Sequence, residues 1–545
     1  MKHSLLSILL LCAVGACAQN MSFEEYKKQA RAEYSSFKSA RQAEFDAFRK
    51  QVNAEYAEFM KKQWTLVEEQ PAEKPIEEKK IKPQVFVEEP QPQPQPEPQP
   101  QPEPQPQPQT EPEVQTQPKQ DTIKTEPQEE KREALQPADS LNTPKLTFQP
   151  KVIAIQPVVT VIPIPTPTPE PIAPVVPEEQ KPSKTVAVSF YGTMVSIGFP
   201  EPDPFSITTL NENALADAWN QLSDEKYDVT VSNMLDARKN LKLCDWGYLE
   251  LVKAITEKHY GKNNTAVYMQ VYLLTQSGYR VRMAFSKKQS RLFLLVASQY
   301  DIFNMTYYRC DGQKFYAIDG KADDMHICPA AVKNEKSLSL QIAQEQKLDK
   351  ESTPKRSLNS KKGLSTTVSV NKNAINFFND YPRAYLNGDP TTCWAAYANT
   401  PLDKSVKNTL YPQLKAKLEG LSEKEAVGQI LNWVQTAFEY EYDDKVWGGD
   451  RVFFALETLY YPYCDCEDRA ILFSRLVRDL VGAKVALLYY PGHLAAAVQF
   501  KDQVNGDYIL YQNKKYVVCD PTYIGAPVGR TMKGMDNQKA KLIIL

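Results

Sequence analysis

A cysteine, a histidine and an aspartate near the end of the chain have the residue types of a nucleophile, a base and a group that orients the base. Cys466 lies in YPYCDCEDR, His493 in YYPGHLAAAVQF, and Asp520 directly follows KKYVVC. A thiol attacks a carbonyl well only when a neighbouring base takes its proton, and that base needs a third group to fix its tautomer. Successive members are 27 residues apart, which fits a helix bearing the thiol and strands bearing the other two. The pattern predicts covalent acyl-transfer chemistry.

The residues after Cys466 predict the helix that positions the thiol. Apolar residues recur at helical spacing, at positions 470, 473, 476, 477, 480 and 481, which puts Cys466 at the helix start on its buried face. Unpaired N–H groups and the positive end of the helix dipole lie there, and both lower a thiol pKa. Cys464 lies before the helix, so we expect it to be an inert neighbour. The alternative is a disulfide with Cys466 or Cys519 that blocks the nucleophile.

The stretch from about 370 to 530 resembles a known family. Cys466 followed by EDRAILFSRLVRDLVGAKVALL, then GHLAAAV, then YVVCDPTY, is similar to the transglutaminase-like core of the papain-like cysteine enzymes. The resemblance implies an α+β fold with a helix packed on an antiparallel sheet. It implies a triad of Cys466 as nucleophile, His493 as base and Asp520 as orienter, with a structural role for Asp468. Cys464 departs from the family pattern, in which a residue other than cysteine is expected.

Each member of this triad also has an ordinary structural interpretation. A single cysteine or histidine among apolar residues is commonly a core residue, and an aspartate before proline is commonly a turn residue. The three together, in family order, favour the triad. A metal site is not expected, because one histidine and a few thiols lack zinc spacing and the carboxylates form no calcium loop. No cofactor is implied.

Composition divides the chain into an unfolded part and a folded part. The 545 residues carry 65 basic and 67 acidic side chains, a balance that gives no electrostatic argument for nucleic-acid binding. Most of the 41 prolines lie between positions 71 and 182, which predicts a Pro/Gln/Glu-rich disordered spacer over 67–185. Two globular domains are expected over 186–330 and 368–545, joined by a polar linker over 331–367.

The first residues, MKHSLLSILLLCAVGACAQN, predict export. A basic start, an apolar run and small residues before the cleavage site are typical of a signal peptide over 1–18. Cleavage before Cys17 would leave a lipidated cysteine that anchors the protein in a membrane. Cleavage at the Ala16-Cys17-Ala18 site would instead leave a soluble protein. Both alternatives place the protein in the periplasm or the cell envelope.

Residues 19–66 predict a helix with an 11-residue aromatic repeat, beginning FEEYKKQARAE and YSSFKSARQAE. A period of 11 keeps the aromatic stripe on one face of a nearly straight helix. Self-association or docking onto the folded domains is the favoured interpretation. The alternative is a helix that binds a membrane surface or a cell wall, since lysine and arginine interleave with the aromatic residues.

The first globular domain resembles a degenerate copy of the second. NNTAVYMQVYLLTQSGYRVRMAF corresponds to the helix and first strand of the second domain, and QKFYAIDG corresponds to KKYVVCDP. In this alignment Lys262 stands in place of the cysteine, Arg291 in place of the histidine, and Asp319 in place of Asp520. The hypothesis is a duplicated, catalytically inactive domain; the alternative is the weak similarity of any helix–strand–strand unit.

The sequence therefore predicts an exported cysteine acyl-transfer enzyme that acts on peptide or carboxamide bonds through a thioester. The substrate is expected to be a protein or peptide, with a cell-wall peptide as one candidate. Water as acceptor gives an amidase or peptidase, and an amine gives a transglutaminase. The alternatives are a cell-wall peptidase and a non-catalytic envelope protein that uses such domains as binding modules.

Overall fold

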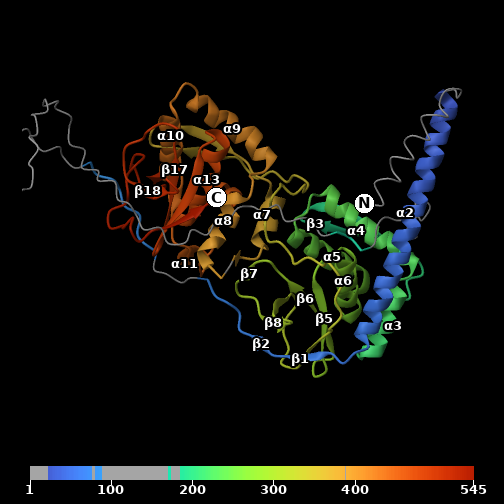
Figure 1. The fold of residues 1–545 in the computed structure, drawn as a ribbon. Helices are drawn as coiled ribbons and strands as arrows, with labels where there is room; N and C mark the ends of the chain where they lie inside the picture. The colour runs from blue at the N-terminus through green and yellow to red at the C-terminus, as the bar shows by residue number, and fades with distance from the viewer. Residues whose placement is uncertain (1–22, 76–79, 89–169, 173–183, 387) are drawn as a thin grey trace, which may run out of the picture. The chain divides into compact units, whose positions relative to one another are not determined.

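The computed structural model describes residues 23–75, 80–88, 170–172, 184–386 and 388–545 (Figure 1). The expected signal peptide, residues 1–18, and most of the expected spacer lie outside these ranges. Residues 1–86 and 150–545 form one compact unit, to which all contacts given below belong. Within the described ranges, no helix combines the length and apolar character needed to cross a membrane.

The C-terminal domain is a five-stranded antiparallel sheet with a long helix against it, which confirms the predicted α+β fold (Figure 1). Helix α13, Cys466–Leu480, packs on the two central strands β16 and β17. The strands follow the order β18-β19-β17-β16-β20, with bounds β16 Lys484–Tyr490, β17 His493–Gln499, β18 Tyr508–Tyr511, β19 Lys514–Cys519 and β20 Lys541–Ile544. The other helices are α7 Lys372–Asn379, α8 Cys393–Asn399, α9 Lys404–Leu418, α10 Glu423–Thr436, α11 Asp443–Val446 and α12 Ala455–Tyr460.

Local sequence determines where α13 begins and ends. At its start, the backbone N–H of Asp465 donates to Asp468 Oδ2 at 3.2 Å. At its end, Gly482 adopts a φ of 77°, a conformation that favours glycine and terminates helices. Between these ends, Phe473 and Leu476 are fully buried in the same core cluster as Ala496 of β17. The helix start is therefore held in a fixed position over the sheet.

The first globular domain contains a seven-stranded sheet in the order β1-β10-β5-β6-β9-β8-β2. Its strands are β1 Thr65–Val67, β2 Glu69–Gln70, β5 Val281–Ser286, β6 Arg291–Ala297, β8 Tyr307–Cys310, β9 Gln313–Ala317 and β10 Met325–Ile327. Its helices are α3 Glu212–Leu222, α4 Asp228–Asn240, α5 Asp245–Tyr260 and α6 Asn264–Gln276. A separate hairpin joins β3 Lys184–Phe190 to β4 Thr193–Phe199.

The two sheets share strand order and register. The run β10-β5-β6-β9-β8 corresponds to β20-β16-β17-β19-β18, with a helix before the first strand in both. Leu295, four residues after Arg291, pairs with Ala317, two residues before Asp319. The same offsets from His493 and Asp520 give Ala497 and Val518, which also pair. This agreement supports the duplication hypothesis, which stays a prediction.

The first copy lacks the chemistry of the second at the corresponding positions. Lys262 lies before α6, because Asn263 caps that helix, and the lysine side chain is 85% exposed. Arg291 begins β6 as His493 begins β17, but its guanidinium donates to the backbone carbonyl of Asp319 at 2.7 Å. An exposed lysine and a charged guanidinium supply neither a nucleophilic thiol nor a neutral base.

The N-terminal helix α2 spans Phe23–Met60 and ends before the expected position 66, while the expected residues 19–22 lie outside the described ranges. Its C-terminal part docks onto the first domain: the Tyr56 ring stacks on Trp219 with centroids 4.1 Å apart, and buried Arg49 forms an ion pair with Asp228. Its earlier aromatic residues Tyr34, Phe37, Phe45 and Phe48 are exposed. The docking interpretation holds for the last turns, and self-association stays a prediction for the exposed stripe.

Two segments expected to be unstructured are instead part of the fold. Residues 65–67 form β1, which pairs with β10 at one edge of the first sheet. Residues 69–70 form β2, which pairs with β8 at the other edge. Residues 331–367 contain the buried side chains Leu338, Leu340 and Leu358 and the hairpin strands β11 Arg356–Asn359 and β12 Ser365–Val368. The expected boundaries at 67 and 331 are therefore wrong. Both segments are polar on average, and this average gives no sign of the few apolar residues that alternate with polar ones in them.

Candidate active site

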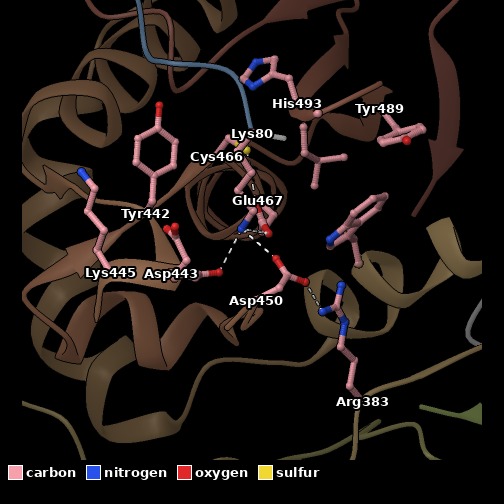
Figure 2. Close-up of a pocket in the computed structure, with 14 residues that line it drawn as sticks. Lys80, Arg383, Tyr442, Asp443, Lys445, Asp450, Cys466, Glu467, Tyr489 and His493 are labelled. Atoms are coloured by element: carbon pink, nitrogen blue, oxygen red, sulfur yellow. Dashed lines mark hydrogen bonds and ion pairs between the residues drawn. The ribbon is translucent and has the colours of Figure 1, made fainter. Parts of the chain in front are cut away.

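A cavity of about 630 Å³ lies beside the start of α13 and is lined by Cys466 and His493 (Figure 2). Cys466 enters from the first turn of α13, and His493 from the first residue of β17. Trp394 of α8 and Tyr489 of β16 form an aromatic part of the wall, with ring centroids 5.2 Å apart. The predicted nucleophile and base therefore share one cavity.

The imidazole of His493 is fixed by Asp520. Because β17 and β19 pair antiparallel, the start of β17 and the residue after β19 lie at the same end of the sheet. His493 Nε2 donates to Asp520 Oδ2 at 2.8 Å, and both side chains are almost fully buried. The other carboxylate oxygen accepts the backbone N–H groups of Thr522 at 2.8 Å and Tyr523 at 3.2 Å. The carboxylate therefore cannot rotate away without losing three hydrogen bonds.

This arrangement selects one tautomer of His493. An ionised carboxylate only accepts hydrogen bonds, so the shared proton belongs to Nε2 and the lone pair to Nδ1. Buried Nδ1 has no hydrogen-bond partner among the residues that the structure describes. A buried, unpartnered ring nitrogen next to a thiol-lined cavity is available to take a proton from a group in that cavity.

Gln435 of α10 holds the loop that follows Asp520. Its amide nitrogen donates to three backbone carbonyls, those of Asp520 at 3.0 Å, Tyr523 at 2.8 Å and Ala526 at 3.1 Å. Its amide oxygen accepts the N–H of Gly525 at 3.2 Å. Because the glutamine is buried, water cannot take over its hydrogen bonds to these carbonyls and to this N–H group. Sequence inspection gave no reason to single it out.

The thiol of Cys466 differs from the sequence-based expectation. The position at the helix start is as predicted, but burial, followed by the carboxylates of Glu467 and Asp465, raises the thiol pKa well above its usual value. The thiol donates to Glu467 Oε2 at 3.1 Å. The expected lowering by the helix dipole is outweighed, first by burial of the thiol and then by the nearby carboxylates.

The carboxylates of Asp443, Asp450 and Glu467 line the cavity around the ammonium of Lys80 (Figure 2). Lys80 Nζ lies 2.7 Å from Glu467 Oε1 and 2.9 Å from an oxygen of both Asp443 and Asp450, and it also contacts Asp465. Lys80 is separated from these residues by more than 360 positions in the sequence. No sequence signal linked them, although the acidic run DCEDR marked one side of the cluster.

The Lys80 ammonium controls the ionisation of this cluster. Burial works to raise the pKa of Glu467, but the attraction of Lys80 and hydrogen bonds from Asp465, Lys80 and Cys466 together outweigh it and bring the pKa to about 2. Burial raises the pKa of Asp443 to about 6 and that of Asp465 well above its usual value, with Lys80 opposing both shifts. Glu467 is therefore the member whose negative charge persists beside the thiol.

Cys464 points away from this chemistry. It accepts a hydrogen bond from Arg469 Nε at 3.5 Å, and burial raises its thiol pKa. Arg469 itself donates to the backbone carbonyls of Gln435 and Phe438 beneath the helix. All seven cysteines in the described ranges are free thiols, so neither a Cys464–Cys466 bridge nor a Cys464–Cys519 bridge is present. This supports the interpretation of Cys464 as an inert neighbour.

Substitution of Glu467 with glutamine is expected to make Cys466 react at lower pH. The carboxylate raises the thiol pKa, so a neutral amide lowers it and increases the thiolate fraction at any given pH. We expect the half-point of the pH profile for iodoacetamide labelling of Cys466 to fall by at least about one unit. Mass spectrometry of the labelled peptide measures it.

The matched control for that substitution is Asp444→Asn, since Asp444 is exposed and lines the same cavity. Its profile should coincide with that of the unaltered protein. An unchanged half-point in Glu467→Gln would show that Glu467 does not govern the ionisation of the thiol.

Comparison with known proteins agrees with this geometry. The model of a transglutaminase-like domain family matches residues 409–540, which include Cys466, His493 and Asp520. The match confirms the resemblance drawn from the sequence, and the C-terminal domain is a transglutaminase-like domain. No curated protein and no solved structure matches the chain with significant similarity.

Proposed function

Starting from this transglutaminase-like domain, a fold of cysteine hydrolases and acyltransferases, we propose that the protein is a cysteine acyl-transfer enzyme acting on peptide or carboxamide bonds. Cys466 is the nucleophile, His493 the base and Asp520 the group that orients the base. The observation that carries the proposal is the buried His493 ring, with Nε2 tied to Asp520 and Nδ1 unpartnered in the same cavity as the thiol.

The first half of the reaction forms a thioester. His493 Nδ1 takes the proton of the Cys466 thiol as Sγ attacks the carbonyl carbon of the substrate. The carbonyl electrons move to the oxygen, and their return breaks the carbon–nitrogen bond. The leaving amine takes the proton from the imidazolium, which Asp520 stabilises while it is charged. An acyl group is then bound to Sγ.

The second half returns the thiol. Water or an amine attacks the thioester while His493 Nδ1 takes a proton from the attacking group. The carbon–sulfur bond breaks, and the departing thiolate regains the proton from the imidazolium. Water gives an acid and makes the enzyme an amidase or peptidase; an amine gives a new amide and makes it a transglutaminase.

Trp394 supplies a candidate hydrogen bond to the developing oxyanion. Its indole N–H is buried, without a partner among the described residues, in a side chain that lines the cavity. Trp394→Phe keeps a ring and removes the N–H. We expect kcat for deacylation of a model ester to fall about 10²-fold with KM nearly unchanged, because the oxyanion forms only in the transition state. A rise in KM alone would assign Trp394 to substrate binding.

The direct test is formation of the acyl-enzyme from an activated ester. Full-length protein mixed with p-nitrophenyl acetate should release a burst of p-nitrophenolate equal to the protein concentration, and the acetyl group should be found on Cys466 by mass spectrometry. Cys466→Ala should lack the burst. The proposal is contradicted if the unaltered protein gives no burst and its acetyl groups are spread over surface lysines.

A non-catalytic binding module is the second candidate. The observation that favours it is the raised pKa of Cys466, which disfavours the thiolate in the resting protein. A protein that binds peptides but forms no acyl-enzyme at any pH would be of this kind. The burst experiment therefore separates the two candidates directly.

Export to the periplasm or cell envelope is part of the proposal and places a protein or cell-wall peptide within reach as substrate. Its support is the signal-peptide pattern of residues 1–18. Mass spectrometry of the mature N-terminus decides the anchoring. A diacylated Cys17 identifies a lipoprotein, a start at Gln19 identifies soluble release, and a retained Met1 excludes both.

A further inference from the structure

A short segment of this chain places one side chain in the cavity of the proposed enzyme. Residues 80–86, KIKPQVF, are called here the 80–86 strap. Lys80 lines the same cavity as Cys466 and His493, and its side chain is only 17% exposed (Figure 2). The strap is more than 360 positions away in sequence from the residues that surround its lysine.

The strap is held through its backbone on both sides of the proposed base. The N–H of Ile81 donates to the carbonyl of Gly492, next to His493, at 3.0 Å. Ile524 donates its N–H to Gln84 and accepts the N–H of Phe86, both at 2.9 Å, in a parallel bridge. Such contacts recognise an extended backbone whatever its side chains, as in strand addition to a sheet edge.

The side chain of Lys80 supplies the selective contact. Its ammonium meets carboxylate oxygens of Asp443 at the start of α11, Asp450 in the loop after α11, and Asp465 and Glu467 at the start of α13. A buried group of carboxylates is costly unless a cation lies among them. An ammonium is a compact point charge with three donors, whereas a guanidinium needs a planar, forked set of acceptors. Because the carboxylate oxygens all lie around one nitrogen atom, the site fits a primary ammonium.

One acceptor of this cluster has no partner within the described ranges while the strap is in place. Asp465 is fully buried, and its Oδ1 has no hydrogen-bond partner among the described residues. Three N–H donors of one ammonium cannot satisfy every oxygen that surrounds it. If Asp465 served only the helix start, both of its buried carboxylate oxygens would be expected to have hydrogen-bond partners.

We propose that the acidic pocket beside Cys466 is a subsite for a primary ammonium side chain on an extended peptide, and that the 80–86 strap occupies it as an internal ligand. The proposal rests on the proposed function in naming that enzyme's substrate class: peptides with a lysine-type side chain next to the reacting bond. The strap must leave before such a peptide enters. In the protein as it stands the strap therefore blocks such peptides, whereas the small ester p-nitrophenyl acetate does not use this subsite.

The blocked state also explains the thiol contact. Lys80 holds Glu467 Oε1 at 2.7 Å while Glu467 Oε2 accepts the thiol hydrogen of Cys466 at 3.1 Å, so the carboxylate that binds the strap also contacts the thiol. A tethered ligand acts at a high effective concentration, in the millimolar range for short connections. A free peptide therefore competes poorly until the tether is released or its lysine is removed.

The test measures peptide binding in a protein that cannot do chemistry. Full-length Cys466→Ala and the double variant Lys80→Gln with Cys466→Ala are titrated into a fluorescein-labelled peptide, acetyl-KIKPQVF, by fluorescence anisotropy. We expect the double variant to bind at least about tenfold more tightly than the single variant, because its own strap has lost its anchoring charge. Equal binding by the two, or no binding by the double variant, overturns the proposal.

Peptide variants test the ammonium contact itself. Replacing the first lysine of the peptide with glutamine should weaken binding to the double variant by at least about 30-fold, the effect of leaving buried carboxylates without their cation. Replacing the second lysine, which corresponds to exposed Lys82, should leave it unchanged. Arginine at the first position should bind more weakly than lysine. Equal loss from both lysine positions indicates general charge attraction and contradicts the subsite.

Two controls separate the remaining explanations. Titrations repeated in excess EDTA and in excess CaCl₂ should agree; binding of calcium in place of the peptide would identify a metal site and overturn the ammonium subsite.

In the unaltered protein, acetylation by an amine-reactive ester should spare Lys80 relative to Lys82, and excess acetyl-KIKPQVF should expose Lys80. A Lys80 that is labelled as fast as Lys82 from the start refutes the blocked state without any variant.

These outcomes are distinct from those for the proposed function. A protein that binds the peptide through the first lysine but forms no acyl-enzyme retains the subsite and loses the catalytic assignment. A protein that forms an acyl-enzyme but ignores the peptide retains catalysis and loses the subsite.

Discussion

His493→Ala is expected to slow acylation of Cys466 by p-nitrophenyl acetate by about 10³-fold at neutral pH. Without the imidazole the cavity loses the proposed base, and burial together with the neighbouring carboxylates holds the thiol pKa well above its usual value. Asp520→Asn should act almost as strongly, by up to about 10⁴-fold, since an amide nitrogen facing Nε2 favours the tautomer whose Nδ1 carries the proton. Stopped-flow release of p-nitrophenolate measures both rates.

The pH dependence distinguishes a lost base from a damaged fold. In His493→Ala the acylation rate should rise steadily with pH as hydroxide generates thiolate, and approach that of the unaltered protein only above the raised thiol pKa. The matched control is His326→Ala, since His326 is a half-buried residue of β10 in the first domain, far from the proposed site in sequence. Equal losses in both histidine variants, or a loss in His493→Ala that is constant over pH, would contradict the role of His493 as base.

The sequence supplied the parts of this site that are set by local pattern. The spacing of apolar residues from 470 to 481 is enough to place Cys466 at a helix start, and apolar runs around His493 and before Asp520 are enough to place them at strand ends. Antiparallel pairing then brings base and orienter together. The strand order shared by the two domains follows from the same repeated helix–strand–strand pattern.

The remaining features depend on contacts between distant residues, which periodicity does not encode. The helix-dipole argument for a lowered thiol pKa considers one helix, whereas the pKa of Cys466 is determined by burial and by side chains that fold around it. Lys80 came from a segment whose proline and glutamate content indicated a spacer, although its backbone pairs at Gly492 and Ile524. Residues 331–367 were assigned to a linker because their average polarity masked buried leucines.

Gln435→Leu is expected to destabilise the C-terminal domain by about 4 kcal/mol. Leucine fills a similar volume but leaves three buried carbonyls and one N–H without partners, each at about 1–3 kcal/mol, with losses that overlap at neighbouring groups. The midpoint of urea unfolding, followed by tryptophan fluorescence, measures the effect. Because one of these carbonyls belongs to Asp520, we also expect acylation of Cys466 to slow about tenfold under conditions where the variant is folded.

Gln413→Leu is the matched control for this substitution. Gln413 makes three hydrogen bonds of similar length, two from its amide nitrogen and one to its amide oxygen, but at a partly exposed position on α9. Water replaces its amide there, so the loss should stay near 1 kcal/mol or less. If both glutamine variants lose the same stability, burial is not what makes Gln435 matter. If Gln435→Leu is destabilised but acylates Cys466 at the normal rate, the loop supports the fold without orienting Asp520, and the two backbone bonds to Asp520 Oδ1 are sufficient to hold the triad.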